Sequence, residues 1–351
     1  MGGGGAEAGG AMTSEVLDPR VDPEPPYWRE LRALAGLRGD WAWDVLRQQA
    51  WCARTPWSVA VSLKGSRPRG FVAAAWIGTR SRRHRFATSR RGGLLGGLDI
   101  RAPGSGAFPA WWFADTDGDG GCGRLLTEYL PSMRRLLGAG MKATLIRQVP
   151  GEGVATLAGR LHLVRETEPI ARVPTAGFTG RDDWLASLPR RRKAQLRKVF
   201  DAIEADVDLT VEVLPGSAVD AVELAELLRL NEVKHRDVPI VPLPQFVGYL
   251  RRLLLQPDVF VLCYRDGNSR RLVAAATVYD HPQWPLARAW SSLPVEDGGR
   301  ADAYFHMYGE LVRWSIERGR RGVVLGKKMA KLKTSLGAEL VPQYAAVVPV
   351  R

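Results

Sequence analysis

Four lysines gather in one short turn near the end of the chain. Lys327 and Lys328 directly follow an apolar segment, residues 322–326, that is typical of a strand, and Lys331 and Lys333 come soon after with no acidic residue among them. Ligands of open α/β sheets gather at the carboxyl ends of strands, where cations can hold an anion or stabilise an oxyanion. The turn therefore predicts such a site, with solvated surface lysines as the alternative.

A second set of cations lies on a helix predicted to start at Pro189. At 100° per residue, the apolar residues Leu196, Val199, Phe200 and Ile203 fall on the side opposite the cations. The cationic face predicts contact with phosphate groups, and a plainly solvated face is an equal alternative. The cations are Arg190, Arg191, Arg192, Lys193, Arg197 and Lys198.

The overall composition agrees with a polyanionic partner. The 351 residues include 50 Lys+Arg and 37 Asp+Glu, a net charge of +13, and a further arginine cluster spans residues 80–91. This balance favours nucleic acid, anionic lipid or a phosphorylated substrate, with arginine enrichment of the genome as the alternative. The length and the 45% hydrophobic content predict a globular protein of two domains.

Other features predict the setting of the protein. Cys52, Cys122 and Cys263 are isolated, which fits a reducing cytoplasm and predicts neither disulfides nor zinc. Residues 1–26 are rich in Gly, Pro and acidic residues and predict a disordered leader. No run of 18 apolar residues occurs, so no membrane span is expected. No pattern indicates an oligomeric state.

Patterns for metal binding and covalent catalysis are not met. Residues 115–120 resemble the start of a calcium loop, but the twelfth position, which needs a bidentate Glu, is Leu126. The histidines are scattered, and neither a Gly-x-Ser-x-Gly elbow nor a Cys/His pairing occurs. We expect no metal and no covalent intermediate, which favours direct transfer.

The elements that must position these residues follow one order in each half of the chain. The second half reads β-α-α-β-β-β-α-β-α-β, and the first half repeats much of this order, with residues 92–97 expected as a flexible loop. We predict an α/β (α+β) protein of two tandem units with mixed sheets. The expected domains are residues 27–177, a basic connecting helix in 178–206, and residues 207–351. The second half divides into strands at 208–214, 259–264, 272–279, 286–292, 322–326 and 340–348, and helices at 220–235, 244–255 and 301–318.

The second half resembles the GNAT acyltransferase fold, and the tandem arrangement over residues 27–351 resembles the FemAB-type aminoacyltransferases. Residues 227–236 are similar to the family's first helix, which ends in a basic residue. Residues 332–337 are similar to its aromatic-Lys-x-x-Phe-Gly turn, with Leu at both aromatic positions, and residues 308–319 to its helix, glycine and strand.

The resemblance implies transfer of an amino acid from aminoacyl-tRNA to the amine of a cell-wall precursor or of a small molecule in specialised metabolism, without a cofactor. Lys333 matches the family's lysine and is implied to stabilise charge at the reacting carbonyl. Arg236, or His235 after a slip of one residue, matches a position that holds an acceptor phosphate. Lys327 and Lys328 are expected to contact donor phosphates.

Direct transfer also needs a group that removes a proton from the attacking amine. His306 and Asp297, near the start of the helix 301–318, are the base candidates. A structural histidine packed among aromatic residues is an equal reading of His306.

Two other functions compete with this hypothesis. Most GNAT proteins use acyl-CoA and hold its pyrophosphate in an Arg/Gln-x-x-Gly-x-Gly/Ala loop. Residues 148–153 spell that pattern but lie in the wrong slot of the repeat, whereas residues 294–300, in the right slot, lack the spacing. An acyl-CoA N-acyltransferase is therefore the first alternative, and a non-catalytic RNA-binding protein on the same fold is the second.

Overall fold

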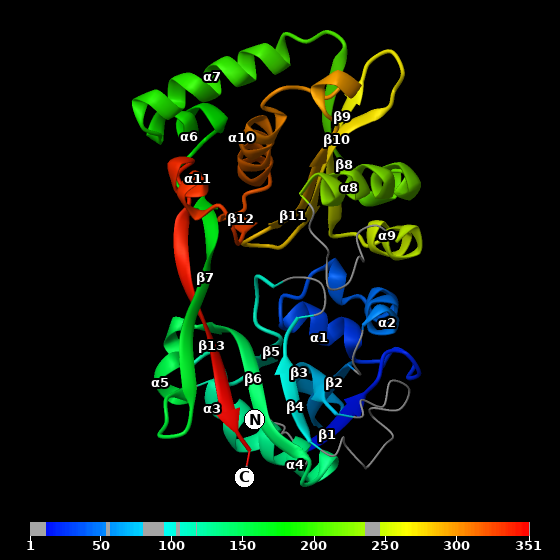
Figure 1. Ribbon diagram of the computed structural model, residues 1–351, viewed down its shortest axis with the longest axis vertical. Coiled ribbons are helices and arrows are strands. Elements are labelled where there is room, and N and C mark those ends of the chain that lie inside the picture. The colour runs from blue at the N-terminus through cyan, green and yellow to red at the C-terminus, as the bar shows by residue number, and fades with distance from the viewer. Residues whose placement is uncertain are drawn as a thin grey trace, which may run out of the picture.

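The structure, a computed structural model, describes residues 12–53, 57–79, 95–102, 106–116, 118–235 and 246–350. Its elements form two α/β units, one above the other in Figure 1, which two long strands connect. Each unit has its own apolar core. No helix among the described residues is long and apolar enough to cross a membrane.

The second unit has the predicted elements in the predicted order, and the strands at 286–292 and 322–326 have the predicted bounds. β10 is buried throughout and β12 at all but its last residue, as their apolar runs predict. The elements are β8 (Leu209–Pro215), α8 (Ala221–His235), α9 (Val247–Leu254), β9 (Val259–Asp266), β10 (Leu272–Tyr279), β11 (Leu286–Ser292), α10 (Ala303–Glu317), β12 (Gly322–Gly326), α11 (Ala330–Ser335) and β13 (Glu339–Pro349).

The first unit repeats this plan with additions. Its long helical segment contains a π-helical stretch, Leu125–Tyr129, between α3 (Cys122–Arg124) and α4 (Leu130–Leu137). The elements are β1 (Met12–Leu17), α1 (Trp28–Leu34), α2 (Trp43–Cys52), β2 (Trp57–Lys64), β3 (Arg67–Gly78), β4 (Gly96–Ile100), β5 (Trp111–Phe113), α3 (Cys122–Arg124), α4 (Leu130–Leu137), β6 (Met141–Pro150), α5 (Val154–Leu157) and β7 (Leu163–Pro174).

Two strands of the first unit correct the sequence predictions. The expected leader is wrong for residues 12–17, because they form β1 and pair with the edge of β2; residues 1–11 lie outside the described part. The expected loop is wrong at Gly96 and Gly97, which begin β4. A Cβ at Gly96 would lie 2.4 Å from the carbonyl oxygen of Ile77, and one at Gly97 would lie 2.3 Å from that of Ala143. Glycine is used here for close strand approach, not for a flexible loop.

The last strands of the two units are exchanged. All strands belong to one mixed sheet in the order β1-β2-β3-β4-β6-β13-β7-β12-β11-β10-β9-β8, with β5 beside β3. Thus β7, which ends the first unit in sequence, pairs with β12 of the second unit, and β13 pairs with β6 of the first. β7 and β13 also pair with each other and run through both units (Figure 1). The two units therefore share a central seam.

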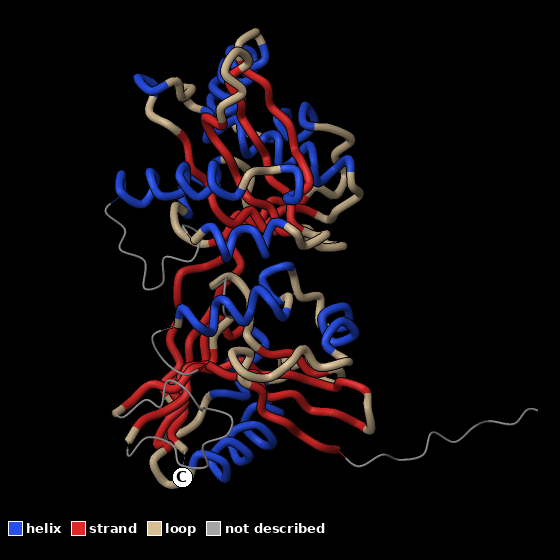
Figure 2. The backbone as a smooth tube through the Cα atoms, turned by 90° about the vertical axis from the view of Figure 1, so that its right-hand side faces the viewer, coloured by secondary structure: helices blue, strands red, loops and turns tan. Residues whose placement is uncertain are grey.

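Two helices connect the units and cover α10. They are α6 (Arg181–Ser187) and α7 (Arg190–Glu204), seen at the top of Figure 1. The predicted apolar face of α7 is buried, with Leu196 and Phe200 almost fully covered. α7 packs closely on α10 because Gly309 has no side chain: a Cβ there would lie 2.4 Å from Cζ of Phe200. Figure 2 shows the helices of both units lying against the continuous sheet.

Candidate active site in the second unit

The two units differ where their two parallel strands meet. In the first unit, β4 pairs with β6 along its whole length, from Gly96 to Ile100. In the second unit, the equivalent strands β11 and β12 pair only at Leu286 and Val324, and β11 then continues to Ser292 beside β10 alone. The sheet of the second unit is therefore open between β11 and β12, on the side of their carboxyl ends, where ligands of α/β sheets bind.

Lys333 closes the end of β12. Its Nζ donates hydrogen bonds to the carbonyl oxygens of Leu325 at 2.7 Å, Gly326 at 3.3 Å and Lys327 at 2.5 Å. The side chain is buried, and burial lowers its pKa to about 8, against the opposing effect of nearby Glu168. The ammonium group thus holds the turn together, and its action on a reacting carbonyl stays a prediction.

The lysine turn, residues 326–331, has unusual backbone geometry. Gly326, Lys328 and Met329 have φ values of 71°, 62° and 55°. Left-handed backbone is uncommon for residues other than glycine, and such strain concentrates at functional sites. Lys328 and Lys331 are exposed and Lys327 is half-buried. The position of these cations at the open end of the sheet agrees with the predicted anion site, while their contact with phosphates stays a prediction.

Aromatic side chains connect β11 to the lysine turn. The ring of Trp290 on β11 lies 5.9 Å from that of Tyr304 on α10. The Tyr304 hydroxyl is 2.5 Å from the hydroxyl of Tyr308 and donates to Sδ of Met329 at 3.6 Å. No sequence motif indicates this contact, because its residues come from three separate elements.

The basic face of α7 is fixed to the same end of the unit. Arg192 donates a hydrogen bond to Oγ of Ser335 at 2.7 Å, and Nε1 of Trp184 donates to the carbonyl oxygen of Leu336 at 3.1 Å. α6 and α7 are thereby attached to α11, which carries the lysine turn. Four of the predicted phosphate-binding residues are exposed and Lys193 is half-buried. The exposed residues are Arg190, Arg191, Arg197 and Lys198.

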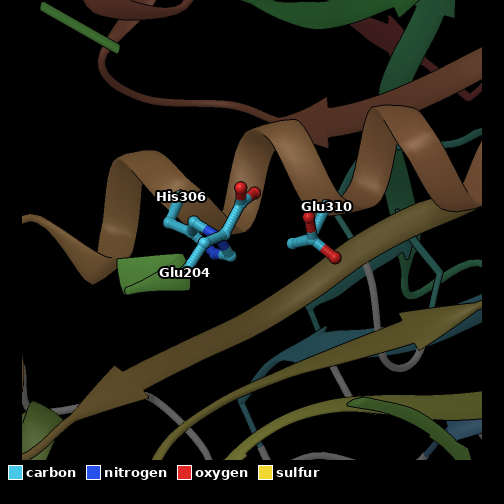
Figure 3. A group of neighbouring side chains, drawn as sticks. All are labelled: Glu204, His306 and Glu310. Carbon is cyan, nitrogen blue, oxygen red and sulfur yellow. The ribbon is translucent and has the colours of Figure 1, made fainter. Parts of the chain in front are cut away.

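His306 lies elsewhere: it belongs to α10, and its side chain lies where that helix packs against α7 (Figure 3). Its Nδ1 is 2.9 Å from the hydroxyl of Tyr264, and its ring packs edge-on against Phe200. Burial lowers the pKa of His306 to about 4, so the ring is neutral, although Glu310 opposes this shift. Nε2 is buried and has no hydrogen-bond partner among the described residues. In the described part of the chain, no hydrogen bond or ion pair joins His306 to Lys333, so its action as the base stays a prediction.

Two glutamates approach His306 and could complete a set of metal ligands. Glu204, His306 and Glu310 each have a ligand atom within 4.8 Å of the others (Figure 3). Both carboxylates are already paired: Arg181 lies 2.5 Å from Glu204 and 3.1 Å from Glu310, and Arg313 lies 2.5 Å from Glu310. Two guanidinium groups at this distance would repel a cation, so the arrangement is that of an ion-pair network.

The remaining predicted residues have different positions. Asp297 is exposed in a 3-10 turn, Val295–Asp297, before α10. In that slot, Arg300 donates to Asp206 and to the carbonyl oxygen of Gly298, both at 2.5 Å, and its charge is thus engaged within the protein. Arg236 and residues 80–91 lie outside the described residues, and the side chain of His235 does as well.

The pattern that resembles a pyrophosphate loop, residues 148–153, is packed against neighbouring segments. It begins at the end of β6, which is the equivalent of β12, and so it lies one strand later in the repeat than a pyrophosphate loop would. A Cβ on Gly153 would lie 2.4 Å from Sγ of Cys122, and Pro150 pairs with Gln343 of β13. This segment is packed against its neighbours and does not form an open loop.

A cavity of about 370 Å³ lies between the two units and reaches the point where β11 and β12 separate. Leu286 and Val324, the one pair that joins these strands, line it. Its walls are largely apolar and include several aromatic side chains, and Asp40 of the first unit also lines it. The sequence did not indicate this site, because its lining comes from both halves of the chain. The aromatic lining residues are Trp41, Phe108, Trp111, Trp112 and Trp284.

Comparison with known proteins supports the fold. No protein-family model and no curated protein matches the sequence. Among solved structures, the C-terminal domain (DUF2156) of a putative lysylphosphatidylglycerol synthetase from Agrobacterium fabrum is similar, at 15% identity and a TM-score of 0.58, over 87% of this chain and 86% of that one. The chain has a fold of two GNAT-like units.

Two further structures share this fold. L-PGS from Bacillus licheniformis is 13% identical with a TM-score of 0.54, over 79% of this chain and 80% of its own. FemX is 11% identical with a TM-score of 0.52, over 82% of this chain and 87% of its own. The fold predicted from the order of elements is thus confirmed.

Proposed function

We propose that the protein transfers an amino acid from aminoacyl-tRNA to the amine of a small-molecule or cell-wall-precursor acceptor in the cytoplasm. One observation carries the proposal: the basic face of α7 and the lysine turn are held together beside the opening between β11 and β12 by the bonds of Arg192 and Trp184. An RNA end presents phosphates over such a surface, and phosphate contacts give affinity without reading sequence. The name of the similar lysylphosphatidylglycerol synthetase agrees with aminoacyl transfer.

In this proposal the opening between β11 and β12 receives the aminoacyl ester. The acceptor nitrogen attacks the ester carbonyl, a C–N bond forms, and the C–O bond to the ribose breaks. The nitrogen loses one proton, and the ribose oxygen gains one. Negative charge develops on the carbonyl oxygen, and the Lys333 ammonium at the end of β12 is the cation that would stabilise it. For this step, Lys333 exchanges one of its three carbonyl acceptors for the oxyanion.

Acyl-CoA is the second candidate donor, because the open parallel strands are a property of the fold and not of one donor. The segment after β11 disfavours it. A Cβ on Gly299 would lie 2.0 Å from the carbonyl oxygen of Leu293, so the backbone is packed on itself where a pyrophosphate loop would be needed. Arg300 is engaged with Asp206.

Donor competition tests the proposal directly. The protein is incubated with a pool of amines and either radiolabelled aminoacyl-tRNA or radiolabelled acetyl-CoA, with and without RNase. We expect a labelled amide from aminoacyl-tRNA that RNase abolishes. A product that requires acetyl-CoA and survives RNase would establish the first alternative. RNA binding without any product would establish the non-catalytic alternative.

Charge reversal on α7 tests the tRNA surface. Replacing Arg190, Arg191 and Arg197 by Glu should raise the KM for aminoacyl-tRNA at least about tenfold and weaken its salt dependence, with kcat little changed, because phosphate contacts act on binding. The matched control reverses three exposed residues of the first unit, Arg29, Lys64 and Lys142. Equal effects of the two sets on KM would contradict a specific tRNA surface.

A further inference from the structure

The cavity between the units has the lining of a small-molecule site. A volume of about 370 Å³ lies in the range of small-ligand pockets, which combine apolar walls with a few polar groups. Five aromatic side chains surround the space, which suits a flat apolar body. Two of the walls are held rigid, since Arg38 lies 4.0 Å from the ring centre of Phe108 and Arg172 lies 4.7 Å from that of Trp284.

The polar groups of the cavity are mostly engaged. Nη2 of Arg38 donates to the carbonyl oxygen of Trp284 at 2.5 Å. Nδ1 of His281 accepts the backbone N–H groups of Gln283 and Trp284, both at 3.1 Å, so its lone pair is not available to a ligand. The Gln343 amide donates to the carbonyl oxygen of Ala107, but its Oε1 is buried without a partner among the described residues. An acceptor without a donor remains at the wall.

Asp40 is the acid of this cavity. It lies in the turn Gly39–Trp41 of the first unit and is 2% exposed. Burial raises its pKa to about 6, against the nearby charges of Arg38 and Arg288, so it is largely ionised at neutral pH. An acidic residue buried at the wall of an apolar cavity favours a cationic ligand group and can accept a proton.

The cavity also borders the strand whose end is held by Lys333. Val324 lines it, and the carbonyl oxygen of the next residue, Leu325, accepts a hydrogen bond from Lys333. A ligand in the cavity thus lies at the closed end of the opening between β11 and β12, on the side of the first unit.

We propose that this cavity binds the acyl acceptor, a primary amine on a flat apolar body, with Asp40 as the carboxylate that holds its ammonium and takes its proton. The proposal rests on the proposed function for the identity of the reaction. The ammonium first gives one proton to Asp40, which releases it to water, and the neutral amine then attacks the ester carbonyl. On attack the nitrogen becomes acidic, and its second proton passes through Asp40 to the departing ribose oxygen. No further reactant is needed.

Binding of model ligands tests the site without tRNA. Tryptamine is titrated into the full-length protein by calorimetry, and indole-3-propionate, which has a carboxylate in place of the amine, serves as the comparison. We expect tryptamine to bind to the wild-type protein and at least about tenfold more weakly to Asp40→Asn. Indole-3-propionate should bind at least tenfold more weakly than tryptamine to the wild-type protein. Asp44→Asn, on α2 outside the cavity, is the matched control and should bind like the wild type.

A pH series and a wall variant complete the test. Tryptamine affinity should fall as the pH drops through about 6, and this fall should be absent in Asp40→Asn. The charged and titratable groups around Asp40 that could also contribute are Arg32, Arg38, Arg288, Asp258, Tyr249, Tyr279 and His281. Trp112→Ala, which leaves Asp40 in place, should weaken tryptamine binding at least about fivefold. This variant tests whether tryptamine binds in the cavity even if the Asp40 variant does not fold.

Three results would overturn the inference: equal tryptamine affinity in the wild type and a folded Asp40→Asn variant, equal binding of the amine and the acid, or no effect of Trp112→Ala. These outcomes are distinct from failure of the proposed donor. Amine binding that depends on Asp40, together with transfer from acetyl-CoA alone, would retain this site and reject aminoacyl-tRNA.

Discussion

Lys333 has a structural task and a proposed catalytic one, and the two can be separated by experiment. Lys333→Ala leaves three carbonyl groups at the end of β12 without their donor. We expect the free energy of unfolding to fall by about 2–3 kcal/mol, since a lost charged hydrogen-bonding group costs on that order. Turnover should fall at least about tenfold, because a charge-stabilising group is lost.

The control for Lys333 is Lys64→Ala, which removes an exposed ammonium group at the end of β2 in the first unit. It should change neither stability nor turnover by comparable amounts. Both variants are assayed well below the melting temperature of the less stable one. Unchanged turnover in a folded Lys333→Ala protein would leave Lys333 with its structural task alone.

His306 predicts a pH dependence of stability. Its pKa is lowered from 6.5 to about 4 by burial, so between these values the unfolded chain binds more protons than the folded one. Stability should therefore be lost as the pH falls from about 6.5 to 4, by roughly 2–3 kcal/mol from this residue. The charged side chains that surround it are Glu204, Glu310, Arg181 and Arg313.

Denaturant unfolding of the wild type and His306→Gln at several pH values isolates that contribution. The variant should be less stable at pH 7 because packing and the Tyr264 contact change, yet lose less stability on acidification. Parallel curves for the two proteins from pH 7 to 4.5 would show that the acid sensitivity belongs to other groups.

The residues that could be predicted are those that lie on local patterns. The lysine turn and the apolar face of α7 follow from a strand end and from helical spacing, and both are found. Asp40 could not be assigned from sequence, because its role depends on strands more than 240 positions away, such as β11 and β12. The one local signal is an acid set directly before the apolar run Trp41 to Trp43, where burial makes an unpaired charge costly.

Among the elements, the contact between α7 and α10 depends on one small residue. Gly309→Ala improves helix propensity, but its Cβ would lie 2.4 Å from Cζ of Phe200 and 3.2 Å from Cδ of Arg181. We expect it to destabilise the protein by about 1–3 kcal/mol, because overpacking outweighs propensity. Thermal unfolding measures the change, and Gly248→Ala on α9, where a Cβ meets no atom within 4 Å, is the control. A stabilised Gly309→Ala protein would contradict the close packing.

Elements were predicted well where the apolar periodicity of the sequence is strong. They were predicted poorly where pairing with a neighbouring strand decides whether a segment becomes a strand. β11 and β12 follow from apolar runs with clear turn signals at their ends. β4 and β1 were missed because glycine-rich and polar sequences become strands only when a neighbouring edge accepts their backbone groups. The opening between β11 and β12 likewise has no local sequence signal, since it is the absence of pairing between two remote segments.

For the whole molecule, the exchange of β7 and β13 predicts that the two units fold together. Fragments 12–177 and 178–350 separate each exchanged strand from its partner: the first keeps β7 without β12 and β6 without β13. We expect neither fragment alone to show a cooperative unfolding transition, and the mixed or co-expressed pair to regain one. Circular dichroism during thermal unfolding measures this. Cooperative unfolding of either fragment alone would show that its unit is independent.

The exchange of strands also sets the order of events during synthesis. When β6 leaves the ribosome its neighbour β13 has not been translated, since nearly 190 residues separate the two strands. Until β13 is made, the edge of β6 that pairs with it stays unpaired. Unpaired edges of a sheet can pair with strands of other chains. The pairing of β7 and β13 therefore makes the nascent chain depend on chaperones. This dependence is greatest until the final strand is released.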